Sequence, residues 1–84
     1  MIDYELLFKR AVAHILELKD VLVYSDGDVL TIKFKMTNDD IPQIRELGRR
    51  LEDSLHLRFT GMGVTPQSVW WYEIIMTFVE DNDD

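Results

Sequence analysis

The sequence feature that most limits the fold is the pair Asp26-Gly27, which separates two segments rich in strand-forming residues. Residues 21–24 are β-branched, leucine or tyrosine, and residues 29–36 alternate between apolar and polar side chains. Asp-Gly between two such segments is a strong hairpin signal, because a type I′ turn requires positive φ at both of its central residues. We therefore predict an antiparallel hairpin over 21–36 with one face toward water.

Two other segments have the apolar spacing of amphipathic helices. The first begins near Asp3 and is predicted to end near Lys19 or Asp20, and its apolar stripe consists of Tyr4, Leu7, Phe8, Ala11, Ile15 and Leu18. The second follows the capping residues of 37–40, with Pro42 in its first turn. Its buried stripe is predicted to consist of Ile41, Ile44, Leu47, Leu51 and Leu55.

The second helix has two further features. Glu46 with Arg50, and Arg49 with Asp53, have the i, i+4 spacing of ion pairs on a solvated helix face. Gly48 lies in the middle of the helix, where glycine costs about 1 kcal/mol relative to alanine. A glycine at this position indicates close approach of a neighbouring element.

The C-terminal part of the chain predicts two more strands. Residues 55–59 are expected to be extended, and residues 60–68 contain enough turn-forming residues to predict a long loop. In the last strand, 69–79, the even-numbered side chains are expected to face the interior (Trp70, Tyr72, Ile74, Met76 and Phe78), leaving Trp71, Glu73 and Ile75 outside.

The order of these elements predicts an α+β fold in which a helix–hairpin unit occurs twice (α-β-β-α-β-β). We expect a single domain over 1–84, with 80–84 a frayed acidic tail. A four-stranded, mainly antiparallel sheet with both helices packed on one face accounts for the apolar stripes. The 84 residues are 46% hydrophobic, which is typical of a globular chain.

The composition limits the cellular compartment and the kinds of partner that we expect. Cysteine is absent, the N-terminus has no signal-peptide pattern, and the longest apolar run is interrupted by Glu73, so we expect a cytoplasmic protein without a membrane partner. The net charge is −7, from sixteen acidic and nine basic residues. Such a chain is repelled by nucleic acid at long range, and a partner with a basic surface suits it better.

No arrangement of residues indicates catalysis. His14 borders an apolar stripe, His56 lies at a helix boundary, and Asp26 with Asp28 is better explained by turn formation than by calcium binding. Gly61-Met62-Gly63 lacks the lysine of a phosphate-binding loop. We therefore predict no enzyme, no cofactor and no metal, with a small-ligand or enzyme site in the 61–68 loop as the least favoured alternative.

The outer sheet face is the predicted interaction surface, together with Met62 protruding from the loop; the residues are Lys33, Lys35, Arg58, Trp71, Glu73, Ile75 and Met62. Glu73 is expected to form a cross-strand ion pair with one of the cations. The leading hypothesis is a small acidic protein that binds a protein partner, such as an inhibitor or regulator of a nucleic-acid-acting enzyme, of the kind that phages use against host defences. The alternatives are a homodimer through the last strand and a single-stranded RNA- or DNA-binding module on the outer face.

Overall fold

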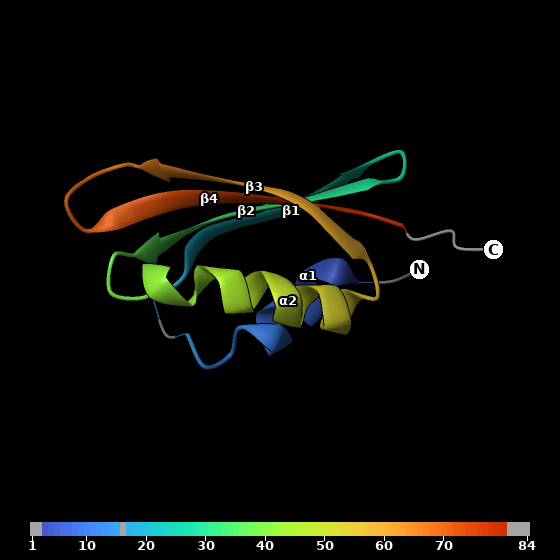
Figure 1. Cartoon of the computed structure of the whole chain (residues 1–84), viewed down its shortest axis with the longest axis horizontal. Helices are drawn as coiled ribbons and strands as arrows, with labels where there is room; N and C mark the ends of the chain where they lie inside the picture. Colours follow the sequence, from blue (N-terminus) through green and yellow to red (C-terminus); the bar gives the residue numbers. More distant parts are fainter. Residues whose placement is uncertain (1–2, 16, 81–84) are drawn as a thin grey trace.

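The computed structural model describes residues 3–15 and 17–80 and has the α+β composition predicted (Figure 1). Its elements follow the order helix, strand, strand, helix, strand, strand: α1 (Tyr4–Ala11), β1 (Lys19–Asp26), β2 (Val29–Thr37), the 3-10 turn η1 (Ile41–Gln43), α2 (Ile44–Leu55), β3 (Arg58–Pro66) and β4 (Trp71–Val79). The described helices are too short and too polar to span a membrane.

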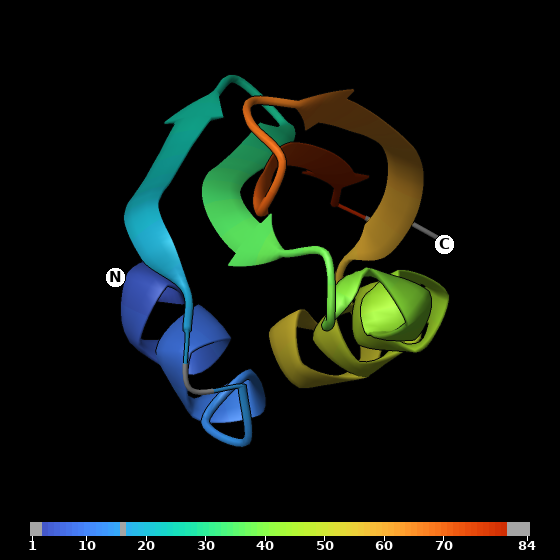
Figure 2. The ribbon, with the colours of Figure 1, turned by 90° about the vertical axis from the view of Figure 1, so that its left-hand side faces the viewer.

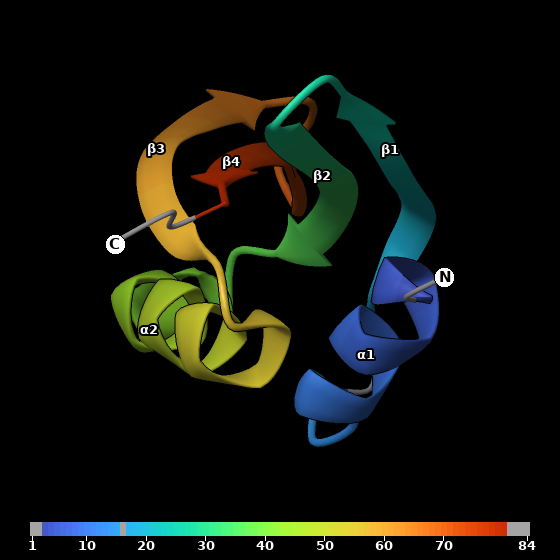
Figure 3. The ribbon, with the colours of Figure 1, turned by 90° about the vertical axis from the view of Figure 1, so that its right-hand side faces the viewer.

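The four strands form one antiparallel sheet in the order β1-β2-β4-β3. The central pair, β2 and β4, is aligned over the full length of both strands, from Val29 opposite Val79 to Thr37 opposite Trp71. Figures 2 and 3 show the sheet curved into an arch, with α1 below β1 and α2 below β3, so that both helices lie on its concave side. The two edges of the sheet are therefore β1 and β3.

Hydrophobic side chains fill the space between the arch and the helices. Phe8 of α1 is fully buried and its ring centroid lies 5.2 Å from that of Phe34 on β2. The inward sets of the two central strands are buried as predicted: Leu30, Ile32, Phe34 and Met36 on β2, and Ile74, Met76 and Phe78 on β4. Among the described residues the core contains no buried polar or charged side chain, so its stability comes from apolar burial and backbone pairing.

The first hairpin forms where Asp-Gly predicts it, with a different turn type. Asp26 pairs with Val29, so Gly27 and Asp28 are the two loop residues. The φ angle of Gly27 is +62°, whereas Asp28 is not among the residues with positive φ. Positive φ at the first central residue alone is the pattern of a type II′ turn, which also matches the twist of paired strands.

The first helix is shorter than its apolar spacing predicts. Asp3 caps it by accepting a hydrogen bond from the Leu6 N–H at 3.1 Å, but the helix ends at Ala11 rather than near Lys19 or Asp20. The chain then follows an irregular connection to Lys19, where the edge strand β1 begins opposite Lys35. Val12 and Ile15 remain buried in the irregular connection, which preserves the apolar pattern beyond the helix.

The second helix follows its predicted pattern closely. After the 3-10 turn that contains Pro42, the stripe of α2 is buried at Ile44, Leu47, Leu51 and Leu55. Arg50 forms the predicted ion pair with Glu46, at 3.2 Å between nitrogen and oxygen. The ion pairs found among the described residues do not include Arg49 with Asp53.

The second hairpin differs most from the prediction. Residues 60–68 are not a long loop, because β3 continues to Pro66 and only residues 67–70 connect it to β4. Gly61 and Gly63, interpreted from the sequence as turn residues, lie in an edge strand. The predicted inward position of Trp70 is therefore wrong: it lies in the connection, and 63% of its surface is exposed.

Candidate functional site

The structure brings most of the predicted interaction residues together on the convex face of the sheet. Lys33 and Lys35 of β2 lie opposite Ile75 and Glu73 of β4, and opposite residues of an antiparallel pair share a face. Trp71 lies on the same face and is half-buried. These residues of the predicted surface therefore lie together on one face of the sheet.

Two residues of the predicted set lie apart from this cluster. Arg58 begins β3 opposite Val79, at the far end of the convex face from Trp71. Met62 lies opposite Met76, whose side chain is fully buried beneath the sheet, so Met62 belongs to the helix-facing side of β3. The bulge between Phe59 and Gly61 shifts the strand register at this point, and the sequence gives no sign of that shift.

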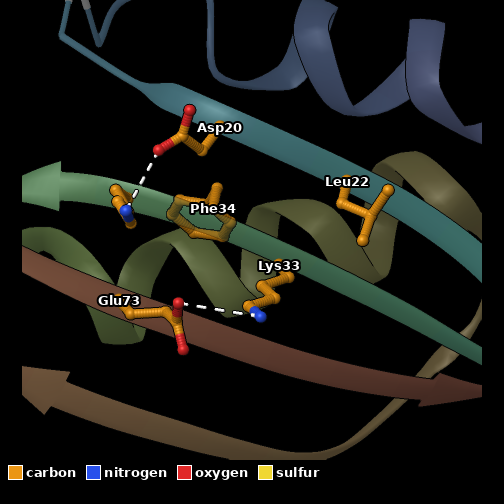
Figure 4. A pocket seen from close by; sticks show the side chains of 6 residues that line it. Asp20, Leu22, Lys33, Phe34 and Glu73 are labelled. Carbon is orange, nitrogen blue, oxygen red and sulfur yellow. Dashed lines mark ion pairs between the residues drawn. The ribbon is translucent and has the colours of Figure 1, made fainter.

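The lysines of the convex face are already paired with other groups of the protein (Figure 4). Lys33 Nζ lies 3.7 Å from Glu73 Oε2, which confirms the predicted ion pair of Glu73, and Lys35 Nζ lies 3.1 Å from Asp20 Oδ2. The ammonium group of Lys19 lies 3.9 Å from the centre of the Trp71 ring, a cation–π geometry. A nucleic-acid phosphate would compete with these partners for the lysine ammonium groups.

A hollow of about 200 Å³ beside β1 is lined by the two ion pairs together with Leu22 and Phe34. It opens where β1 changes register between Lys19 and Leu22, with Asp20 at a φ of +55°. Ligand pockets usually measure about 300–1,000 Å³. The hollow is smaller than that, and its cationic and anionic side chains neutralise one another.

The described residues contain no group of three or more His, Cys, Asp or Glu side chains arranged to hold a metal ion. The 61–68 loop, considered as a small-ligand site, does not exist as a loop, because residues 61–66 form most of β3.

The surface that sequence reasoning missed is the far half of the β3–β4 hairpin. Residues 59–72 contain no Asp, Glu, Lys or Arg, in a chain in which 30% of residues are charged. Several of its apolar side chains are exposed: Val69 by 77%, Trp70 by 63%, Val64 by 40% and Met62 by 39%. The absence of charge over this length was the available signal, whereas the turn-forming residues of 60–68 predicted a loop.

Hydrogen bonds fix the backbone at the tip of this hairpin. The Ser68 hydroxyl oxygen accepts from the N–H groups of Trp70 and Trp71 at 3.3 and 3.2 Å. The Trp71 carbonyl accepts from Gln67 N–H at 2.9 Å, and the Trp70 carbonyl accepts from Asn38 N–H at 3.0 Å. The turn thus holds the Trp70 backbone on two sides while its indole ring remains exposed.

Acidic residues lie beside this tip. Because Asn38 bonds to Trp70, the connection between β2 and α2 lies next to the hairpin end (Figure 1). A hollow of about 260 Å³ beside Thr37 is lined by His14, Glu17, Asp39 and Asp40. The connection that bonds to the tip therefore carries Asp39 and Asp40, which line this hollow with Glu17; we call these three carboxylates the acidic border (Glu17, Asp39 and Asp40).

Comparisons with known proteins do not add to this description. The sequence matches no family model, and searches of curated proteins and of solved structures found no significant match. Function must therefore be argued from the surface itself.

Proposed function

We propose that this chain is a non-enzymatic protein-binding domain, and that the tip of the β3–β4 hairpin inserts Trp70 into an apolar pocket of a partner with a basic rim. The observation that carries the proposal is the pair Val69 and Trp70, which are 77% and 63% exposed at the end of a turn with a fixed backbone. Tryptophan is among the side chains most often found as the energetic centre of an interface.

An exposed indole on a fixed turn is well suited to binding. Burial of the exposed part of Trp70 would contribute on the order of 3 kcal/mol, from typical aromatic areas at 25 cal/mol per Å². The hydrogen bonds of Ser68 and Asn38 hold the backbone in the unbound chain. Little conformational entropy is then lost on association, which favours affinity.

Charge supports a partner that is basic around its pocket. The tip itself is uncharged, but the connection that bonds to it through Asn38 carries two residues of the acidic border, Asp39 and Asp40, and the whole chain carries −7. Complementary charge at the rim of an interface raises the association rate and disfavours wrong partners. Enzymes that act on nucleic acid present such basic surfaces, so inhibition or regulation of one is a specific form of this proposal.

The first experiment compares two substitutions of exposed aromatic residues. Tagged wild-type protein, Trp70→Asp and Tyr24→Asp are used to capture proteins from a lysate of the source cells. Tyr24 is 48% exposed on the convex face of β1 and serves as the matched control. We expect a partner that wild type and Tyr24→Asp retain and Trp70→Asp loses, with both variants folded by circular dichroism. Retention by folded Trp70→Asp contradicts the proposal.

A second experiment tests the charge of the partner once it is identified. Removal of two charges at the acidic border, with Glu17→Gln and Asp39→Asn, is expected to lower the association rate constant and its dependence on salt. The control removes two charges at the opposite end of the sheet, with Asp26→Asn and Asp28→Asn. Equal effects of the two pairs of substitutions on the association rate constant would show that the net charge of the chain, and not the position of the charges, sets this rate.

A further inference from the structure

The two edge strands of the sheet are protected to different degrees. β1 carries Lys19, Asp20 and Asp26, and its register changes between Lys19 and Leu22. β3 has no charged side chain after Arg58. Charges and bulges on edge strands prevent other chains from pairing with their free N–H and C=O groups. The β1 edge is therefore guarded against strand addition, and most of the β3 edge is not.

The protections of β3 are confined to its ends. At its start, the Phe59 N–H donates to Glu52 Oε2 at 2.8 Å, and a bulge follows between Phe59 and Gly61. At its end, Pro66 has no N–H to offer. Between them, residues 62–65 are exposed, and in the described part of the chain no side chain hydrogen-bonds to their backbone.

We propose that the β3 edge is a homodimer interface, at which residues 61–65 pair antiparallel with the same residues of a second copy. Antiparallel pairing of a strand with itself is self-complementary, which is what a two-fold interface requires. The joined sheet has eight strands. This inference does not depend on the proposed function, because it uses the edge of the hairpin and leaves its tip free.

Charge identifies the second copy as the occupant of this edge. Two chains of net charge −7 repel each other, and most of their surfaces bring carboxylates together. Residues 59–72 contain no charge, so the β3 edge is where two copies approach with the least repulsion. Addition of a charged peptide would gain no ion pair along this strand.

The side chains of the strand suit this pairing. In a register centred on Gly63, Met62 of one copy lies opposite Val64 of the other on the helix-facing side. These two side chains are 39% and 40% exposed in the single chain, and each would cover the other. On the convex side the strand presents Gly61, Gly63 and Thr65, which leave no bulky group to obstruct the joined sheet.

The expected dimer is weak and places the two tips far apart. Stable interfaces usually bury about 1,200–2,000 Å², and pairing of two five-residue segments buries less, so we expect weak and reversible association. Because the strands are antiparallel, the Pro66 end of one copy lies at the Arg58 end of the other. The two Trp70 side chains then lie at opposite ends of the sheet.

Sedimentation velocity of the purified chain over a range of concentrations tests the interface without any other partner. We expect reversible dimerisation in wild type, loss of the dimer in Val64→Lys, and a dimer in Leu22→Lys, which adds the same charge at the 52% exposed Leu22 of β1. A monomer at every concentration overturns the proposal. A dimer that persists in folded Val64→Lys, or that Trp70→Asp abolishes, overturns it as well.

Amide hydrogen exchange provides a readout that needs no variant. As the wild-type concentration rises, exchange of the amides of 62–65 is expected to slow, while that of β1 amides is expected to remain unchanged. Slowing of β1 alone, or of neither edge, contradicts pairing through β3.

Discussion

The aromatic ring of Phe59 lies against the backbone of Gly48: a Cβ atom built on this glycine would be 3.1 Å from Phe59 Cε2. The ring also packs against Phe78, with ring centroids 5.3 Å apart. Gly48 therefore marks the close approach of α2 and β3, as its position in the middle of a helix predicts. This contact fixes the start of β3 beside α2.

Substitution of Gly48 by alanine is expected to have opposite effects in two backgrounds. In wild type, the added methyl group meets the fixed Phe59 ring, and overpacking should outweigh helix propensity and lower the free energy of unfolding by about 1 kcal/mol. With Phe59→Ala, the same substitution should raise it by up to about 1 kcal/mol through helix propensity. Urea denaturation of wild type, the two single variants and the double variant measures the coupling between positions 48 and 59. A change in the free energy of unfolding on Gly48→Ala that has the same sign in both backgrounds contradicts this contact.

The two adjacent tryptophans are expected to differ in fluorescence. Trp70 is 63% exposed in the connection, whereas Trp71 is half-buried on β4 beneath the Lys19 ammonium group. In Trp71→Phe, which leaves Trp70, acrylamide should quench the emission more strongly than in Trp70→Phe, and the emission maximum should lie at longer wavelength. The reverse order would place Trp70 in the interior, as the strand parity of the sequence had predicted.

Gly27 and Gly63 provide a matched pair of glycines. A Cβ at either position meets no atom within 4 Å, but only Gly27 has a positive φ, of +62°. Gly27→Ala should therefore lower the free energy of unfolding by about 1–2 kcal/mol through backbone strain alone. Gly63→Ala should leave it unchanged or raise it by up to about 1 kcal/mol. Equal losses in urea denaturation would contradict the turn geometry.

His56 ends α2 in the left-handed conformation, with a φ of +56°. Glycine adopts this conformation without the steric cost of a Cβ, so His56→Gly is expected to raise the free energy of unfolding by about 0.5–1 kcal/mol. His56→Ala keeps the cost and should give no gain. A thermal unfolding series of the three proteins decides this, and stabilisation by alanine equal to that by glycine would contradict a strained helix end.

Local chemistry made much of the fold predictable from the sequence. Three features each follow from one periodicity bounded by turn or capping residues. They are the Asp26-Gly27 hairpin, the alternation of β2 and the buried stripe of α2. The end of α1 was not predictable in the same way. No glycine or proline marks it, and Val12 and Ile15 stay buried after the helix has ended.

The candidate site was harder to predict because tertiary pairing decides it. Gly61 and Gly63 favour a turn by local propensity, but β4 provides a partner that holds them in a strand. With the connection shortened to 67–70, Trp70 moves out of the strand and its side chain out of the core. Because β4 begins at Trp71 and not at residue 69, Trp70 carries the most exposed aromatic ring of the hairpin, although it was predicted to lie in the core.

Site-specific photo-crosslinking shows whether Trp70 at the hairpin tip contacts the partner. A photoreactive phenylalanine analogue replaces Trp70 in one protein and Tyr24 in another, and each is irradiated in a lysate of the source cells. We expect a covalent adduct with one partner protein from position 70 and none with that protein from position 24. An adduct from position 24 alone, or from neither position, would contradict this contact.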